Sequence, residues 1–181
     1  MIDCDVTNNG CQGGWSTKGY AYTSKYGLMN KVDYPYTGAK GACQYDETKA
    51  IFKNTGMVQE RYVSNLQLMS IVAKQPVSAG IVVTNAFRNY KEGILVEDDL
   101  KCSSEKKHIN HQVTIVGYGE TQPGTIEYSW CKQFWVARNS WGSSWGENGY
   151  FRLCMDGAGK DKTPYGTCQI NRFPSYPTLQ E

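Results

Sequence analysis

The sequence lacks long apolar runs, a marked excess of charge of either sign and internal repeats. Although 40% of its 181 residues are hydrophobic, no stretch approaches the roughly 18 to 20 apolar residues of a membrane-spanning helix. Its 19 basic and 17 acidic residues are scattered, so we expect neither a nucleic-acid nor a membrane partner. Residues 1–10 show neither the basic nor the apolar region of a signal peptide. The chain is long enough to bury a core in one domain or two small lobes.

Cysteine, in contrast, is plentiful. Seven cysteines are many for a cytosolic protein and favour an oxidising compartment, in which disulfides persist. Because the number is odd, one thiol is free or has its partner outside this sequence. Counting alone does not decide which cysteine is left over or how the other six pair.

Helical periodicity is confined to two short stretches. Aromatic and small residues recur with the helical period over residues 15–26 and stop at Gly27, which predicts a first helix there. Ser64 and Gln67 have the spacing of a capping box, which predicts a second helix over residues 65–74.

Beyond the second helix the chain changes to β-branched and aromatic runs bounded by glycine, which indicate strands. The first third of the chain is therefore expected to be loop and helix and the remainder mostly sheet. This pattern predicts an α+β fold with two unlike lobes. The expected strands are residues 77–83, 112–119, 133–140 and 149–153.

Both histidines of the chain lie in the sequence HINHQVTIVGYG, residues 108–119. His111 stands at the head of an expected strand, whereas His108 follows charged residues and is expected in a solvated loop. A lone histidine is more often structural than catalytic, so this position alone does not decide its role. The other polar anchor is Asn139, in the sequence RNSWG.

Several motifs in the same order closely resemble the papain-like cysteine peptidases, and the resemblance covers essentially the whole chain. They are NNGCQGGW at 8–15, QPVSAGI at 75–81, HINHQVTIVGYG at 108–119, RNSWGSSWGENGY at 138–150 and PSYP at 174–177.

The resemblance implies the papain-like two-lobe fold. Residues 1–57 would be the remainder of the helical lobe. Residues 58–181 would form an antiparallel, β-barrel-like lobe that carries the catalytic histidine and asparagine, with the C-terminal tail crossing back.

By the same resemblance, His111 is expected to be the catalytic base and Asn139 the side chain that orients its imidazole. A thiol is mostly protonated at neutral pH, so a neighbouring imidazole is needed to hold the thiolate. Trp141 would cover the histidine–asparagine hydrogen bond, and Trp145 would line the leaving-group side of the cleft. Packing in a core fits both tryptophans equally well.

The nucleophile itself is missing. The family's C-G-[SA]-C-[WY] motif lies about 130 to 150 residues before the histidine and asparagine, which places it before residue 1, and the motif occurs nowhere in the chain. The oxyanion glutamine is missing too. Cys11 partly matches the caspase pattern but has no histidine upstream. We therefore expect a chain without its N-terminal segment and nucleophile helix, and inactive alone, in which Cys11 is a disulfide half whose partner is missing.

Three disulfides are expected among the other six cysteines. The resemblance implies two of them, whereas the third is inferred from cysteines that flank two antiparallel strands. The first two are Cys4–Cys43 and Cys102–Cys168, and the third is Cys131–Cys154.

The resemblance also implies substrate contacts. The backbone at Gly13 and Gly14 would bind an extended peptide, and one pocket would accept an apolar or aromatic side chain two residues before the scissile bond. Gln112 departs from the small residue usual in the family, and Gln169 departs from glycine. The pocket positions are Trp15, Ser16, Gly80, Ile109, Gln112 and Phe173.

The sequence therefore favours a cysteine endopeptidase that acts on peptide or protein substrates. We expect it to be monomeric and to need no cofactor or metal. Its expected location is a lysosome-like vacuole or the outside of the cell. The alternative is a nucleophile-less relative that binds peptides or regulates an active peptidase. A zinc module on Cys4, Cys11, His108 and His111 is a third hypothesis, but its spacings do not match those of zinc fingers.

Overall fold

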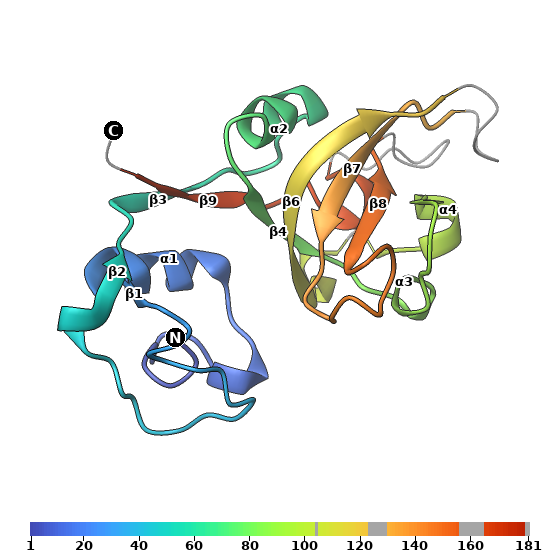
Figure 1. Cartoon of the computed structure of the whole chain (residues 1–181). Helices are drawn as coiled ribbons and strands as arrows, with labels where there is room; N and C mark the ends of the chain where they lie inside the picture. The colour runs from blue at the N-terminus through green and yellow to red at the C-terminus, as the bar shows by residue number, and fades with distance from the viewer. Residues whose placement is uncertain (104, 123–129, 156–164, 180–181) are drawn as a thin grey trace. The chain divides into compact units, whose positions relative to one another are not determined.

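A computed structural model describes residues 1–103, 105–122, 130–155 and 165–179 (Figure 1). The chain divides into two compact units. The first unit combines Met1–Gln59 with Ser175–Glu181, and the second unit is Glu60–Pro174.

The first unit consists of short elements. The helix expected over residues 15–26 is confirmed as α1 (Ser16–Lys25), which ends where Gly27 takes a φ of 85°. The strands were not predicted, because each is only two to four residues long and is defined by its partner: β1 pairs with β2, and β3 with β9, both antiparallel. The remaining elements are η1 (Gly10–Gln12), β1 (Leu28–Met29), η2 (Glu47–Lys49), β2 (Ala50–Phe52), β3 (Gly56–Gln59) and β9 (Ser175–Thr178).

Polar contacts and one cross-link hold the first unit together. Thr23 of α1 donates a hydrogen bond of 2.5 Å to Asn54, whose amide in turn donates to the carbonyl oxygens of Tyr20 and Gly56. Among its described residues no apolar side chain is buried, and Val6 is 86% exposed. The hydrophobic effect therefore contributes little to the stability of this unit.

The second unit is built on a sheet with the strand order β4-β6-β7-β8-β5. Its neighbours are antiparallel except β5 and β8, which are parallel. The expectation of antiparallel strands is therefore confirmed for every pair but one. The expectation of a barrel is wrong, because in the described part of the chain the sheet is open and does not close on itself. The elements are α2 (Asn65–Val72), β4 (Val77–Ile81), α3 (Asn85–Arg88), β5 (Ile94–Leu95), α4 (Glu97–Leu100), η3 (Lys106–His108), β6 (His111–Glu120), β7 (Gln133–Arg138), β8 (Tyr150–Cys154) and η4 (Thr167–Gln169).

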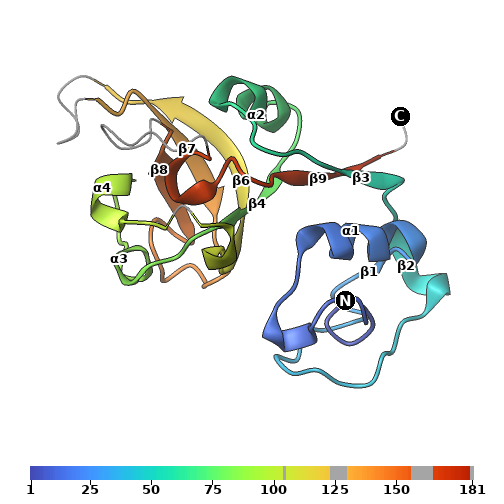
Figure 2. The same cartoon turned by 180° about the vertical axis from the view of Figure 1, so that it is seen from behind.

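The helix α2 begins as its sequence predicts. Ser64 accepts from the backbone N–H of Gln67, and the Gln67 side chain accepts from the backbone N–H of Ser64, which is a complete capping box. The helix ends at Val72, two residues earlier than expected. It packs against β6, while α3 and α4 lie together on the side of β8 (Figures 1 and 2).

The core of the second unit lies between the sheet and these helices. Alternate residues of β7 are buried, which is the period of a strand with one face in a core. The disulfide between Cys131 and Cys154 joins the segment before β7 to the end of β8. The largest fully buried side chains of this unit include Leu68, Phe87, Ile115, Trp135, Phe151 and Leu153.

Candidate active site

The sheet brings the two candidate catalytic residues together. His111 is the first residue of β6 and pairs with Ile81 of β4. Asn139 directly follows β7, whose last residue, Arg138, pairs with Thr114 of β6. Because β6 and β7 are antiparallel, the start of one and the end of the other meet at the same edge of the sheet.

Asn110 fixes the start of β6 and was missed by the sequence reasoning. Its carboxamide accepts from the backbone N–H of Val83 at 2.8 Å and donates to the carbonyl oxygen of the same residue at 3.1 Å. These two bonds clamp the chain immediately before His111 to the segment that follows β4.

The hydrogen bond between His111 and Asn139 defines the tautomer of the imidazole. Nε2 of His111 lies 2.8 Å from Oδ1 of Asn139, and the backbone N–H of Ser140 donates to the same oxygen at 2.8 Å. The Ser140 bond identifies this atom as the oxygen of the carboxamide, because an amide nitrogen could not accept it. Nε2 therefore carries the proton, which leaves Nδ1 of the neutral ring free to accept one.

Trp141 packs against the imidazole of His111. Its ring centroid lies 4.9 Å from that of His111 at an interplanar angle of 34°. Asn139 is only 7% exposed, and His111 is half-buried. A hydrogen bond in such a low-dielectric environment is stronger than one in water.

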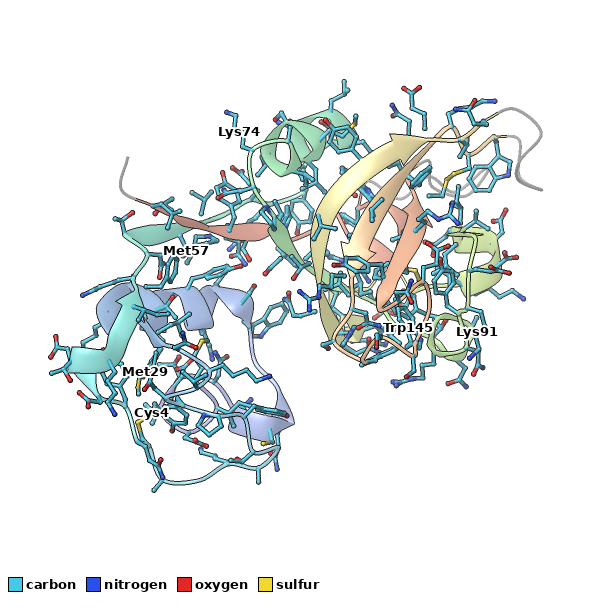
Figure 3. All side chains as sticks on the ribbon, in the orientation of Figure 1. Cys4, Met29, Met57, Lys74, Lys91 and Trp145 are labelled. Carbon is cyan, nitrogen blue, oxygen red and sulfur yellow. A yellow bond between two sulfur atoms is a disulfide. The ribbon has the colours of Figure 1, made fainter. Side chains whose placement is uncertain are left out.

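Trp145 lies in the loop between β7 and β8 (Figure 3). Its ring belongs to the same aromatic cluster as that of Trp141. It stacks on Phe87 at 5.4 Å, meets Trp141 edge-on at 5.1 Å and donates its indole N–H to the carbonyl oxygen of Arg88. The core-packing role considered for the two tryptophans is thus present, and it is compatible with a role in a cleft.

The seven cysteines all lie in the described part of the chain. Six form the disulfides Cys4–Cys43, Cys102–Cys168 and Cys131–Cys154, which are the pairs expected from the sequence. Cys11 is unbonded and exposed. The zinc hypothesis is wrong in this structure, because the disulfide of Cys4 leaves it no thiolate to bind a metal.

Known proteins resemble this chain over most of its length. The model of the papain family cysteine proteases matches residues 1–178. The chain is 35% identical over 184 residues to ananain from Ananas comosus, covering 99% of this chain and 47% of ananain. It is also 36% identical over 159 residues to a cathepsin L-like proteinase from Fasciola hepatica, covering 86% and 45% of the two chains. The chain belongs to the papain family.

Solved structures of papain-family members share the fold. The bromelain protease from Ananas comosus in complex with the E64 inhibitor matches with a TM-score of 0.82 at 30% identity, over 99% of this chain and 75% of that one. The proform of the ragweed pollen allergen Amb a 11 matches with a TM-score of 0.81 at 32% identity, over 99% and 50%. The chain spans about half the length of the curated relatives it matches.

The residues expected to contact substrate fall in both units. In the second unit, Gly80 pairs with Gln112 across β4 and β6, and Phe173 is buried beside Tyr62. Ile109 is half-buried just before β6. The expected residues of the first unit are Gly13, Gly14, Trp15 and Ser16.

The first-unit turn around Gly14 is ordered by Asn8, whose carboxamide accepts from the backbone N–H of Trp15 at 2.8 Å. A Cβ on Gly14 would lie 2.2 Å from that carboxamide oxygen, so only glycine fits. Gly13 has a φ of 100° and open space around it. The turn therefore presents a backbone without side-chain cover at Gly13.

The two departures from the family pattern have different consequences. Gln169 has a φ of 69°, in the left-handed region that favours glycine. Its side chain compensates by donating to the carbonyl oxygens of Ser103 and Glu105. The buried Oε1 of Gln112 has no hydrogen-bond partner among the described residues, and a buried acceptor costs free energy unless something donates to it.

Glu97 supports the disulfide of the second unit and was not anticipated. Its two carboxylate oxygens accept from the backbone N–H groups of Cys102 at 3.0 Å and Cys168 at 2.7 Å. Burial raises the pKa of Glu97, against the opposing effect of these hydrogen bonds. The three residues form the one cluster of possible metal-ligating atoms in the described part of the chain, but both of its sulfurs are in the disulfide.

None of the helices within the described ranges is long and apolar enough to cross a membrane.

Proposed function

We propose that this chain contributes the histidine and asparagine of a cysteine endopeptidase, and that the nucleophilic thiol belongs to chain outside these 181 residues. The observation that carries the proposal is the shielded bond from Nε2 of His111 to Oδ1 of Asn139, 2.8 Å long. Membership of the papain family supports the same chemistry.

The path of the protons in the reaction follows from the tautomer of His111, in which Nε2 carries the proton and Nδ1 can accept one. Nδ1 of His111 takes the proton of the thiol, and the resulting thiolate attacks the carbonyl carbon of the scissile peptide bond. The imidazolium returns that proton to the leaving amine as the C–N bond breaks, which leaves an acyl-enzyme. A water molecule then gives a proton to Nδ1 and attacks the thioester, and the proton returns to the sulfur when the C–S bond breaks. Throughout, Asn139 holds the Nε2 proton and the plane of the ring.

The substrate is proposed to be a peptide or protein segment in extended conformation. The open space at Gly13 leaves room for an extended peptide beside the turn; the N–H and carbonyl of Gly13 itself are bonded to Gly10 and Asn9. We propose that an apolar or aromatic side chain of the substrate is accepted by Gly80, Ile109, Gln112 and Phe173 of the second unit, together with Trp15 and Ser16 of the first. Trp145 would line the leaving-group side.

The three disulfides support a vacuolar, lysosome-like or extracellular location, because such cross-links persist in oxidising compartments. We propose that the protein acts as a monomer.

The test is hydrolysis of a fluorogenic peptide by the native protein and by its variants. His111→Ala should abolish turnover, and Asn139→Ala should lower kcat by about 100-fold, the lower end of what a positioned general base contributes. Glu92→Gln, which changes an exposed side chain outside the proposed site, is the control and should leave kcat unchanged. The 181-residue chain alone should show no turnover that a thiol alkylator blocks.

Two outcomes would contradict this function. Inactivation of the native protein by an alkylator that modifies Cys11 alone would move the nucleophile to Cys11. A native protein that starts at Met1, binds peptides and never cleaves them would establish the nucleophile-less relative instead.

A further inference from the structure

The loop between β7 and β8, residues 139–149, carries Asn139, Trp141 and Trp145. It folds back on itself, with the N–H of Gly149 donating to the carbonyl oxygen of Trp145. Left-handed φ values recur along it, at Gly142, Gly146, Asn148 and Gly149. Backbone hydrogen bonds between Glu147 and Tyr150, and from Asn139 to Gly149, close the loop, and contacts of its side chains add to them.

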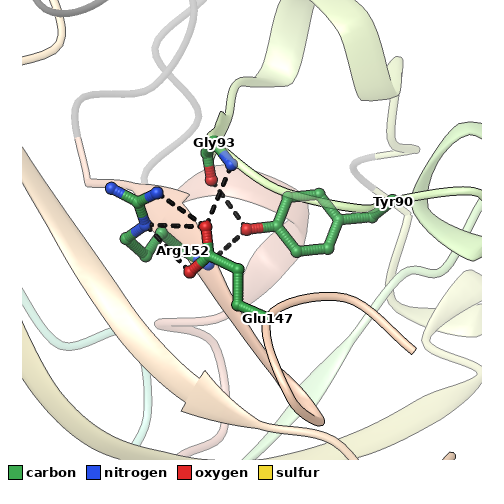
Figure 4. Close-up of polar contacts among 4 residues, drawn as sticks. All are labelled: Tyr90, Gly93, Glu147 and Arg152. Atoms are coloured by element: carbon green, nitrogen blue, oxygen red, sulfur yellow. Dashed lines mark hydrogen bonds and ion pairs between the residues drawn. The ribbon is translucent and has the colours of Figure 1, made fainter. Parts of the chain in front are cut away.

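One ion pair holds the far end of this loop to β8 (Figure 4). The guanidinium of Arg152 donates to both carboxylate oxygens of Glu147, with Nε 3.0 and 3.1 Å away and Nη2 2.6 Å from Oε1. Oε1 also accepts from the backbone N–H of Gly93 at 3.0 Å. The pair thus fixes three segments of the chain, and its fork geometry is the most directional form of ion pair.

The charges of this pair persist although it is partly buried. Burial would raise the pKa of Glu147, but the hydrogen bonds from Arg152 and Gly93 outweigh it, and the pKa lies below its ordinary value. The pKa of Arg152 is raised, chiefly by its hydrogen bonds to Glu147. Both groups are therefore ionised at neutral and mildly acidic pH.

Tyr90 connects the ion pair to the aromatic cluster. Its hydroxyl donates to the carbonyl oxygen of Gly93 at 2.7 Å and accepts from the backbone N–H of Arg152 at 3.4 Å (Figure 4). Its buried ring lies 5.5 Å from that of Trp145. A Cβ on Gly146 would lie 3.0 Å from the same ring, so Tyr90 packs directly on the loop backbone.

A continuous series of ring contacts leads from there to the histidine. Trp145 meets Trp141 at 5.1 Å, and Trp141 covers His111 at 4.9 Å. If the ion pair is lost, the backbone bonds between Glu147 and Tyr150 remain, but the loop opens more often and the two tryptophans move with it. Water then reaches the hydrogen bond between His111 and Asn139.

We propose that Glu147, Arg152 and Tyr90 are positioning residues that hold Trp141 over the hydrogen bond between His111 and Asn139. None of the three contacts the imidazole, so they act only through the loop. The effect of these residues on peptide cleavage rests on the proposed function. Their effect on how easily water reaches the imidazole of His111 does not.

The test measures how fast the Nε2 proton of His111 exchanges with water, by NMR of the 181-residue chain labelled with nitrogen-15. Glu147→Gln keeps the size of the side chain and removes its charge, and it should speed the exchange about tenfold, as expected when a local opening becomes easier. Tyr90→Phe keeps the ring and removes the hydroxyl, and should speed it by a smaller factor. The other histidine, His108, is exposed and serves as an internal reference.

Glu105→Gln is the matched control. It removes the carboxylate of the exposed ion pair with Lys107, 2.9 Å long, and should leave the exchange at His111 unchanged. If Glu147→Gln folds with native spectral dispersion and leaves the exchange unchanged, the proposal is wrong. If Glu147→Gln unfolds, Tyr90→Phe is used instead, and an unchanged exchange rate at His111 in that variant would show that the proposal is wrong.

A second readout separates this inference from the proposed function. In a native protein that cleaves peptides, Glu147→Gln should lower kcat about tenfold while KM stays within about twofold, since the pair is proposed to act on the base and not on substrate binding. A rise in KM with unchanged kcat would overturn the positioning role. If the native protein cleaves nothing, the proposed function fails, and the exchange experiment still decides whether these residues shield His111.

Discussion

The carboxamide of Asn139 accepts two hydrogen bonds and thereby determines which nitrogen of His111 carries the proton. The motifs around both residues made this pair predictable from the sequence, because the spacing of glycine and tryptophan is specific. The supporting carboxylates were not predictable. Glu97 bonds Cys168, 71 positions away, and Glu147 bonds Gly93, 54 positions away, and no local pattern encodes such partners.

Glu97 yields a prediction about pH. Because burial raises its pKa above the ordinary value of 4.5, the folded protein binds this proton more tightly than the unfolded chain does. Its contribution to the free energy of unfolding is therefore largest below about pH 4.5 and falls as the pH rises through the raised pKa. Urea unfolding gives the free energy of unfolding of the wild type and of Glu97→Gln. We expect the wild-type value to fall relative to that of the variant between pH 4.5 and 7.

The exposed carboxylate of Glu92 provides the control for that experiment. Glu92→Gln should leave the free energy of unfolding close to that of the wild type, because the side chain of Glu92 is exposed. A wild-type advantage over Glu97→Gln that grows with pH would contradict the raised pKa.

At the scale of elements, the spacing of apolar residues and the capping motif predicted helices and strands reliably. They predicted α1, α2 and the four longest strands, since in each of these a face is buried or a cap is formed within the segment. The elements β1, β2, β3, β5, β9, α3 and α4 were missed. Each has only two to four residues. The strands exist because a partner strand elsewhere in the chain completes them, and α3 and α4 are too short to show a helical period.

The loop between β7 and β8 gives a prediction at this scale. Gly142 and Gly146 both have a left-handed φ, but a Cβ on Gly142 meets nothing within 4 Å, whereas one on Gly146 lies 2.6 Å from the carbonyl oxygen of Tyr150. Gly142→Ala should cost about 1 kcal/mol through backbone strain alone. Gly146→Ala should cost at least about 1 kcal/mol more, because the clash adds to the strain.

Thermal unfolding followed by circular dichroism measures both costs. Equal losses of stability in the two variants would show that the loop backbone does not hold Gly146 against its neighbours, and would weaken the positioning role proposed for Tyr90.

At the scale of the whole molecule, the two units differ in how they are stabilised. The second unit has a hydrophobic core, whereas the described residues of the first unit bury no apolar side chain. A nucleophile helix outside these residues, as proposed above, would account for the exposure of apolar side chains such as Val6 in this unit. The same proposal accounts for an odd number of cysteines and for the unbonded, exposed Cys11.

The identity of the reactive thiol tests this account most directly. The native protein is treated with iodoacetamide at neutral pH, with and without Asn139→Ala, and the alkylated cysteine is located by mass spectrometry of its peptides. We predict that the fast-reacting thiol lies on a peptide upstream of Met1 and that its reaction slows in the variant. Fast alkylation confined to Cys11, unaffected by Asn139→Ala, would contradict the account.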